Sequence, residues 1–243
     1  MIPLQDILPR RNPPIMTWLI ILVNVLVFFH ELQLTPYQRE IFFHTWGFIP
    51  ARFFEPHYIG IVKEAVYQKY LTLITHLFIH GGWFHIIGNM WTLWIFGDNV
   101  EDRLGPFRFL IFYLTCGIAA SLFHGFIYPY STIPVVGASG AISAVMGAYF
   151  VMYPFARILV LFPILFIPFF FEIPAFLYLI FWFFIQFYSG LFSLVVPGGV
   201  GGVAWFAHVG GFIAGAMLHR LFCSGKCRFY RDEYGFWSSF CHR

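Results

Sequence analysis

A serine and a histidine lie in apolar stretches of this chain, where polar side chains are costly and usually functional. Ser139 stands two residues after Gly137 and directly before Gly140, at the opening of one stretch, and His208 lies inside another. A neutral imidazole can accept the proton of a serine hydroxyl and so make that hydroxyl a nucleophile. The two residues together predict nucleophilic catalysis inside a lipid bilayer.

Each of these residues alone also has a structural interpretation. Ser139 is expected where an irregular loop becomes a helix, and serine is favoured there as a helix cap, while His208 could simply bond to a neighbouring carbonyl. The same helix start, however, would present unpaired N–H groups and the positive end of the helix dipole to an anion. Gly137 and Gly140 would allow the tight bend and the close approach of a substrate that this chemistry requires.

A second helix is expected to carry His85 and Asn89, which are four residues apart and therefore share one face. Both can donate hydrogen bonds without carrying charge, as the stabilisation of an oxyanion in a low-dielectric site requires. With the amide of Ser139 they form a candidate oxyanion hole. The alternative is a polar clamp between membrane helices.

His76 and His80 precede that helix, also four residues apart. With His85 they could be taken for metal ligands. No carboxylate or thiol lies nearby in the sequence to complete such a site, so no metal is predicted. We expect the two histidines to form hydrogen bonds that hold the preceding loop over the helix.

Carboxylates do not fall well inside any of the apolar stretches; Asp98, Glu101 and Asp102 lie at the end of one of them. The predicted catalytic unit is therefore a Ser–His dyad without a carboxylate. Packing or another polar group must then orient the imidazole.

Helices that cross a membrane must position these residues. The chain is 60% hydrophobic and 10% charged, whereas a soluble domain carries about 25% charged residues, and nothing in this composition supports nucleic-acid binding. Six stretches have about the 20-residue length that a spanning helix needs. They are residues 15–32, 83–101, 106–127, 138–155, 174–192 and 202–222. The expected fold is an all-α membrane protein, a bundle of six transmembrane helices.

Two connections between these stretches are unusual. Residues 33–82 form a long first loop that is only half polar, and we expect it to be partly embedded in the membrane. Residues 157–173 are very apolar but contain Pro163, Pro168 and Glu172. Because prolines break helices, we expect an interfacial segment here rather than a seventh span.

Charge placement predicts the orientation. Six spans put ten of the 14 Lys and Arg residues on the side of both termini and the other four in the long first loop, so the positive-inside rule places both termini in the cytoplasm. The chain then divides into a cytoplasmic segment (1–14), a membrane domain (15–222) and a cytoplasmic tail (223–243). No cleavable signal peptide is visible.

The tail contains cysteines that could be metal ligands. Cys223, Cys227, Cys241 and His242 could hold zinc. Adjacent ligands at 241 and 242 suit one tetrahedral ion poorly, and free thiols in a reducing cytoplasm are the favoured interpretation.

Small residues recur at four-residue steps in the fourth and sixth spans. They are Gly140, Ala144, Ala148, Gly211 and Gly215. Such stripes let membrane helices approach closely. Packing alone would explain them, but close approach of these two spans would also bring Ser139 beside His208.

With these features the chain resembles the rhomboid intramembrane serine proteases, in particular a six-span bacterial or archaeal member. Four segments carry the resemblance, in the family's order and spacing, over roughly residues 40–220. They are Trp46-Gly-Phe-Ile-Pro-Ala-Arg-Phe53, His76-x3-His80-x4-His85-x3-Asn89, Gly137-Ala-Ser-Gly140 and Ala207-His208-x2-Gly211-x3-Gly215. Each segment is weak alone; four in order are specific.

The resemblance implies that Ser139 is the nucleophile and His208 the general base of a Ser–His dyad. It implies an oxyanion hole made by His85, Asn89 and the Ser139 amide.

The resemblance also implies the helix packing, the substrates and the gate of the protein. Gly211 and Gly215 would pack closely against the fourth helix. The substrates would be membrane-spanning helices of single-span proteins, cut near their outer ends without any cofactor, in a prokaryotic inner membrane. The fifth helix and residues 193–201 resemble a mobile gate and cap.

Two positions depart from the family pattern. Some members carry a Trp-Arg pair where this chain has Leu71 and Thr72, and some carry a tyrosine that stacks on the base where this chain has Ser143. The loop is then expected to be braced differently, and another residue must fix the imidazole of His208.

Two other function classes have less support than proteolysis. A proteolytically inactive relative would bind membrane helices without cutting them, but inactive relatives usually lack the serine or the histidine. A channel or transporter has less support, because no inverted repeat or pair of broken helices is visible. The sequence predicts neither the physiological substrate nor the oligomeric state.

Overall fold

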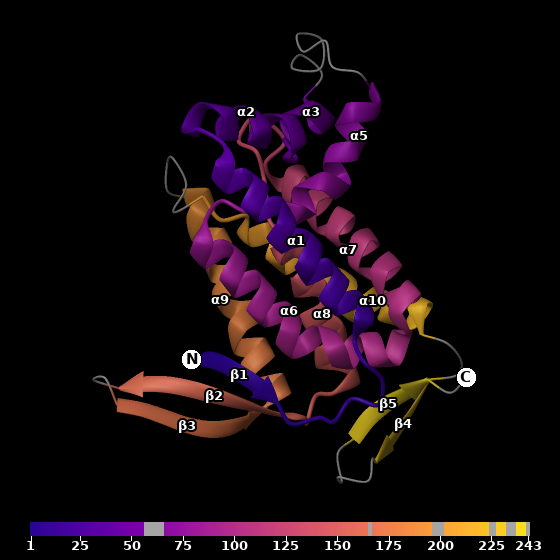
Figure 1. Ribbon diagram of the computed structural model, residues 1–243. Coiled ribbons are helices and arrows are strands. Elements are labelled where there is room, and N and C mark those ends of the chain that lie inside the picture. Colours follow the sequence, from indigo (N-terminus) through magenta and orange to yellow (C-terminus); the bar gives the residue numbers. More distant parts are fainter. Residues whose placement is uncertain (56–65, 165–166, 196–201, 224–226, 232–236, 242–243) are drawn as a thin grey trace.

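The described part of the chain is mostly helical. The structure, a computed structural model, describes residues 1–55, 66–164, 167–195, 202–223, 227–231 and 237–241. Six helices form a bundle, and each coincides with one predicted span (Figure 1). They are α1 (Ile15–Gln33), α6 (Trp83–Leu104), α7 (Pro106–Ile127), α8 (Ser139–Met152), α9 (Ala175–Val195) and α10 (Trp205–Phe222). The helical membrane bundle expected from the sequence is confirmed.

The helices differ in whether their length and apolar character suit a membrane span. Among the described residues α1, α7 and α9 are long and apolar enough, and α6 joins them if it counts as one span with Tyr67–Phe78, from which it is bent by 80°. α8 is apolar but has only 14 residues. These helices fit a multi-pass membrane protein, and the count of six spans stays a prediction.

α8 lies at the centre of the bundle, and every residue from Gly140 to Tyr149 is buried. α10 crosses it closely. A Cβ at Gly211 would collide with the carbonyl oxygen of Gly140, and one at Gly215 with the carbonyl oxygen of Ala144. Glycine is thus the residue that allows the two backbones to touch.

The long first loop is folded over the end of the bundle away from β1. It contains α2 (Pro36–Trp46), α3 (Ala51–Phe54), α5 (Val66–Thr75) and the short 3-10 helix η1 (His76–Phe78). Thr35 and Gln38 form a capping box that starts α2. Phe48 pairs with Val135 through two backbone hydrogen bonds of 3.0 and 2.7 Å, which tie the loop to the segment before α8. Its depth in a membrane stays a prediction.

At the opposite end lies a three-stranded antiparallel sheet, which the all-α expectation missed (Figure 1). Its strands are β1 (Ile2–Asp6), β2 (Arg157–Ile164) and β3 (Ile167–Pro174), in the order β1-β2-β3. β2 and β3 therefore pair as antiparallel strands, and the interfacial location expected for residues 157–173 stays a prediction. The prolines that exclude a helix lie opposite each other, Pro163 facing Pro168, and the β-branched and aromatic residues between them and the bundle favour strands.

The N-terminal strand is anchored to the bundle at Asp6. Its carboxyl oxygen Oδ2 accepts hydrogen bonds from the Tyr149 hydroxyl and the Asn99 amide, each 2.7 Å long. Burial raises the pKa of Asp6 from 3.8 to about 7, although both hydrogen bonds act in the opposite direction. Residues 1–14 are therefore attached to the bundle rather than free.

The tail contributes a second antiparallel pair, β4 (Cys227–Arg231) and β5 (Trp237–Cys241). The Cys223 thiol is partly buried. His242 and the side chains of Cys227 and Cys241 lie outside the described parts, so the tail's metal chemistry stays untested.

Candidate active site

Ser139 and His208 meet where α8 begins. The serine is the first residue of α8 and the histidine the fourth of α10, and Ser139 Oγ lies 2.8 Å from His208 Nε2. The close crossing at Gly140 and Gly211 brings together these residues, 69 positions apart in sequence. A hydroxyl and an imidazole nitrogen at this distance can exchange a proton.

The second ring nitrogen of His208, Nδ1, is hydrogen-bonded to a residue that the sequence analysis did not single out. Gln186 of α9 is buried, and its Oε1 lies 2.8 Å from His208 Nδ1. Because an amide oxygen only accepts hydrogen bonds, Nδ1 carries the proton of the neutral ring and Nε2 offers its lone pair to Ser139. Gln186 is the lone amide in an almost entirely apolar helix, a signal that could have found it.

Two indole rings flank the histidine. The Trp182 ring lies 6.1 Å from the His208 ring at an interplanar angle of 32°, and the Trp205 ring lies at the same distance but nearly perpendicular, at 84°. Ser143, at the position where some relatives have a tyrosine, instead donates its hydroxyl hydrogen bond to the Ser139 carbonyl oxygen, at 2.6 Å. The imidazole is thus packed by tryptophans and oriented by an amide.

His85 and Asn89 face the backbone just before Ser139. Gly137 has a φ of +125°, and a Cβ there would lie 2.6 Å from His85 Nε2 and 3.7 Å from Asn89 Nδ2. The Gly81 N–H donates to His85 Nδ1 at 3.3 Å, so the neutral ring carries its proton on Nε2, toward Gly137. Asn89 Nδ2 is buried and has no hydrogen-bond partner within the described residues. Two donors therefore point to the same small space.

A cavity of about 1010 Å³ joins these groups. Ser139, His208, His85, Asn89 and Gln186 all line it. Its wall also includes residues 202–204, which precede α10; residues 196–201 of the expected cap lie outside the described parts. A peptide segment could contact the hydroxyl, the base and both donors within this one space.

The two loop histidines behave differently from each other. His76 Nδ1 donates to the Thr72 carbonyl oxygen at 2.7 Å, and its Nε2 lies 2.8 Å from the Ser121 hydroxyl of α7. The backbone N–H of His80 donates to the Glu31 carboxylate at 3.2 Å. Both histidines thus tie the loop to helices of the bundle, His76 through its ring and His80 through its backbone. In the described ranges no three His, Cys, Asp or Glu side chains gather as a metal site would require.

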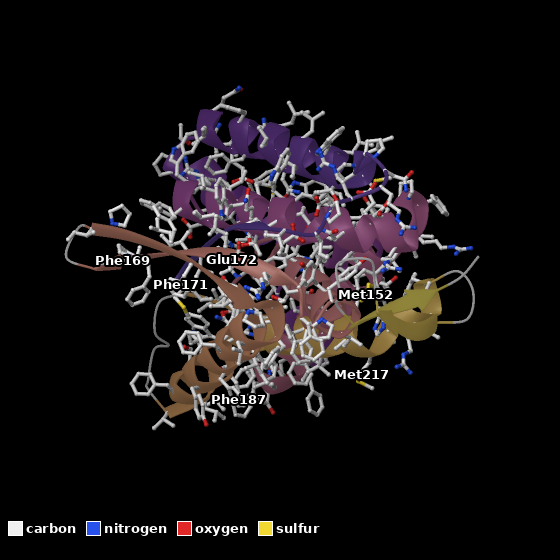
Figure 2. All side chains as sticks on the ribbon, turned by 90° about the horizontal axis from the view of Figure 1, so that it is seen from below. Met152, Phe169, Phe171, Glu172, Phe187 and Met217 are labelled. Atoms are coloured by element: carbon white, nitrogen blue, oxygen red, sulfur yellow. The ribbon has the colours of Figure 1, made fainter. Side chains whose placement is uncertain are left out.

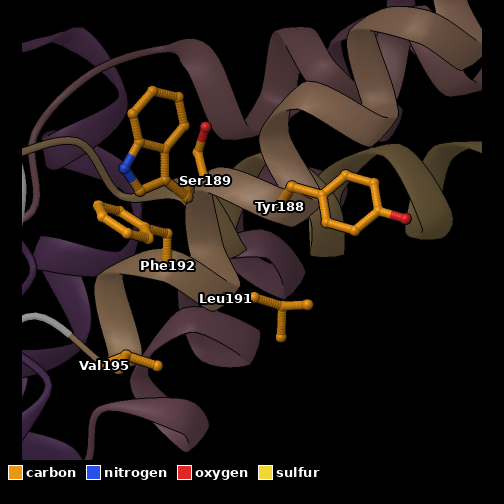
Figure 3. A pocket seen from close by; sticks show the side chains of 6 residues that line it. Tyr188, Ser189, Leu191, Phe192 and Val195 are labelled. Carbon is orange, nitrogen blue, oxygen red and sulfur yellow. The ribbon is translucent and has the colours of Figure 1, made fainter.

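A second, smaller cavity of about 610 Å³ lies where α9 ends and α10 begins (Figure 3). It is lined by Tyr188, Ser189, Leu191, Phe192, Val195 and Trp205. Trp205 also lies beside His208, so this apolar surface adjoins the Ser139–His208 pair.

Comparisons with known proteins agree on one family. The family model of the rhomboid domain matches residues 67–225. The mitochondrial rhomboid protein 1 of Saccharomyces cerevisiae is 32% identical over 127 residues, which are 50% of this chain and 36% of that protein. The mitochondrial RHOMBOID-like protein 12 of Arabidopsis thaliana is 29% identical over 203 residues, 77% of this chain and 56% of that one.

A bacterial relative matches as well. Rhomboid protease GlpG of Salmonella newport is 28% identical over 146 residues, which cover 60% of this chain and 46% of GlpG. The chain therefore spans between about a third and somewhat over half of the length of these three relatives.

Proposed function

Since the chain belongs to the rhomboid family, we propose that it is an intramembrane serine endopeptidase that cuts membrane-spanning helices of single-span proteins. The observation that carries this proposal is the 2.8 Å distance between Ser139 Oγ and His208 Nε2 inside a cavity that two further hydrogen-bond donors face. The mechanism needs no cofactor.

The first half of the reaction forms an ester. His208 Nε2 takes the proton of the Ser139 hydroxyl while Oγ attacks the carbonyl carbon of the scissile peptide bond. The oxyanion accepts hydrogen bonds from His85, Asn89 and the Ser139 amide, which as a first-turn N–H has no partner within the helix. The imidazolium then gives its proton to the leaving nitrogen, the C–N bond breaks, and an acyl-enzyme remains.

The second half releases the product. His208 takes a proton from water, the hydroxide attacks the ester carbonyl, and the proton returns to Ser139 Oγ as the C–O bond breaks. The substrate helix docks beside α9, where the apolar cavity at Trp205 adjoins the catalytic groups, and unwinds locally to expose the bond.

The site lies near the end of the bundle away from β1, because α8 begins there. With both termini in the cytoplasm, cleavage occurs toward the outer side of the membrane. The named relatives are mitochondrial and bacterial. They do not select one membrane, and a prokaryotic inner membrane stays part of this proposal.

The alternative is a relative that binds membrane helices without cutting them. Labelling with a fluorophosphonate, followed by peptide mapping, separates the two functions. We expect an adduct on Ser139 in the wild type and none in His208→Ala. An unlabelled wild type would favour the alternative.

A further inference from the structure

We infer that Gln186 is a positioning residue that keeps the ring proton of His208 on Nδ1. The reactivity of Ser139 then depends on the position of α9, the helix that carries Gln186. This inference rests on the proposed function, because it concerns the same imidazole. Gln186 and His208 come from different helices, α9 and α10.

Gln186 fixes the tautomer of the His208 ring. Nε2 can act as a base only when the single ring proton is on Nδ1. Gln186 Oε1 is the partner found for Nδ1 in the described residues, at 2.8 Å. Without this acceptor the ring could turn its N–H toward Ser139 Oγ, and Nε2 could no longer receive the serine proton.

Few polar side chains connect α9 to the rest of the bundle, and Gln186 is one of them. In the described part of the chain, α9 makes two side-chain hydrogen bonds to other elements: Gln186 to His208, and Ser193 to the Tyr128 hydroxyl, both 2.8 Å. Much of the rest of α9 is exposed apolar surface, including Phe181, Phe184 and Tyr188. An outward movement of α9 that admits a substrate would therefore lengthen the Gln186–His208 bond. The imidazole of His208 would regain its orientation when α9 moves back.

Kinetics in proteoliposomes test this inference with three variants. Gln186→Leu keeps the volume but removes the acceptor, and we expect kcat to fall about 10- to 100-fold, within the range that general-base catalysis contributes, with KM changed less than about twofold. Gln186→Glu restores an acceptor, so it should recover most of kcat. Because a carboxylate stabilises the imidazolium, it should also move the acid limb of the kcat–pH profile to higher pH. Ser193→Ala removes the other side-chain hydrogen bond of α9 but no partner of His208, so the acid limb of its kcat–pH profile should stay at the wild-type pH.

The outcomes separate this inference from the proposed function. A Gln186→Leu variant with the wild-type kcat and pH profile would overturn the positioning role while proteolysis stands. Equal loss in the Leu and Glu variants would also overturn it, since packing rather than the acceptor would then matter. A wild type that neither cuts nor labels would overturn the proposed function itself.

A separate observation concerns the β2–β3 hairpin, and we infer that it lies in the headgroup region of the bilayer. Its exposed aromatic residues include Phe169, Phe170 and Phe171, and Figure 2 shows Phe169 and Phe171 on the hairpin beyond the bundle. Because successive side chains of a strand point to opposite faces, Phe170 lies on the face opposite to the other two, so both faces are apolar. In water such a hairpin would be a site of aggregation. β3 runs directly into α9, so its surface continues the exposed apolar surface of that helix.

Lipid suits this hairpin better than a protein partner. A flat partner would cover one face, whereas both faces here need an apolar or interfacial surrounding. Among the described strands, β3 pairs with β2 along one edge only and is the edge strand of the sheet. Its outer backbone groups therefore suit the hydrated headgroup region and exclude the hydrocarbon core. Arg157 and Glu172 form an ion pair of 3.4 Å where the hairpin leaves the bundle.

Photo-crosslinking in lipid nanodiscs tests this location. p-Benzoylphenylalanine replaces Phe170 or Phe171, and the same substitution at Phe184, on the exposed surface of α9, serves as the reference for lipid contact. We expect lipid adducts at all three positions by mass spectrometry. Adducts at Phe184 alone, or crosslinks from the hairpin to a second protein chain, would overturn the inference.

Discussion

The backbone of α10 at Gly211 touches the backbone of α8 at Gly140, because neither residue has a side chain to separate them. This contact is one residue beyond Ser139 and three beyond His208. The same crossing that packs the two helices therefore sets the distance between Ser139 and His208, the proposed catalytic pair.

Replacement of Gly211 by alanine tests this link between packing and chemistry. The added Cβ would collide with the Gly140 carbonyl oxygen, and since backbone cannot give way as a side chain can, the helices must separate. We expect a loss of stability of about 1–3 kcal/mol and loss of fluorophosphonate labelling. Gly88→Ala is the matched control, because a Cβ there meets nothing within 4 Å. Equal melting temperatures for both variants would contradict the account.

The proposed oxyanion hole predicts a selective loss of rate in a variant of Asn89. Asn89→Ala removes a donor that is buried and unpartnered in the described residues, so kcat should fall about 10²–10³-fold while KM stays nearly constant. Thr92→Ala removes another polar group that lines the same cavity, but its hydroxyl bonds to the Gly88 carbonyl oxygen. That control should keep its kcat; a similar loss in both variants would assign Asn89 to packing.

The buried carboxyl of Asp6 predicts a pH-dependent stability. Its pKa is about 7 when folded and near 3.8 otherwise, so the folded state holds more protons between these two values. Stability should therefore fall as pH rises from about 4 to 7. Thermal unfolding of the wild type and of Asp6→Asn, which cannot ionise, measures the contribution. The variant should show a flatter dependence; parallel curves would mean that Asp6 is not the cause.

The contact between His76 of the first loop and Ser121 of α7 predicts an effect on stability. Ser121→Ala leaves His76 Nε2 buried without its partner, which should cost about 1–3 kcal/mol of stability. Denaturant unfolding in detergent measures this loss. Since the Ser121 hydroxyl lies against His76 Nε2 rather than against Ser139 or His208, the folded protein should keep its kcat; a large fall in kcat with unchanged stability would point to a different role.

The sequence predicts the helices well because each depends on a local property, the length of an apolar run. The approach of α8 and α10 follows less directly, from stripes of small residues and from the family resemblance. Gln186 could not be assigned to His208, because the rotation of α9 about its axis depends on packing against other helices rather than on its own residues.

The β2–β3 hairpin could not be predicted from the sequence either. The prolines at 163 and 168 exclude a helix, but a strand needs a partner, and β2 pairs with β1 at the far N-terminal end of the chain, Ile2 facing Leu161. Such distant pairing leaves no local periodicity.

The most direct measurement is cleavage of a panel of single-span substrates in proteoliposomes, with cut sites mapped by mass spectrometry for the wild type and Ser139→Ala. The account predicts one or few cuts near the outer end of a spanning helix by the wild type, and none by a folded Ser139→Ala protein. The same cuts by both proteins would contradict the role of Ser139.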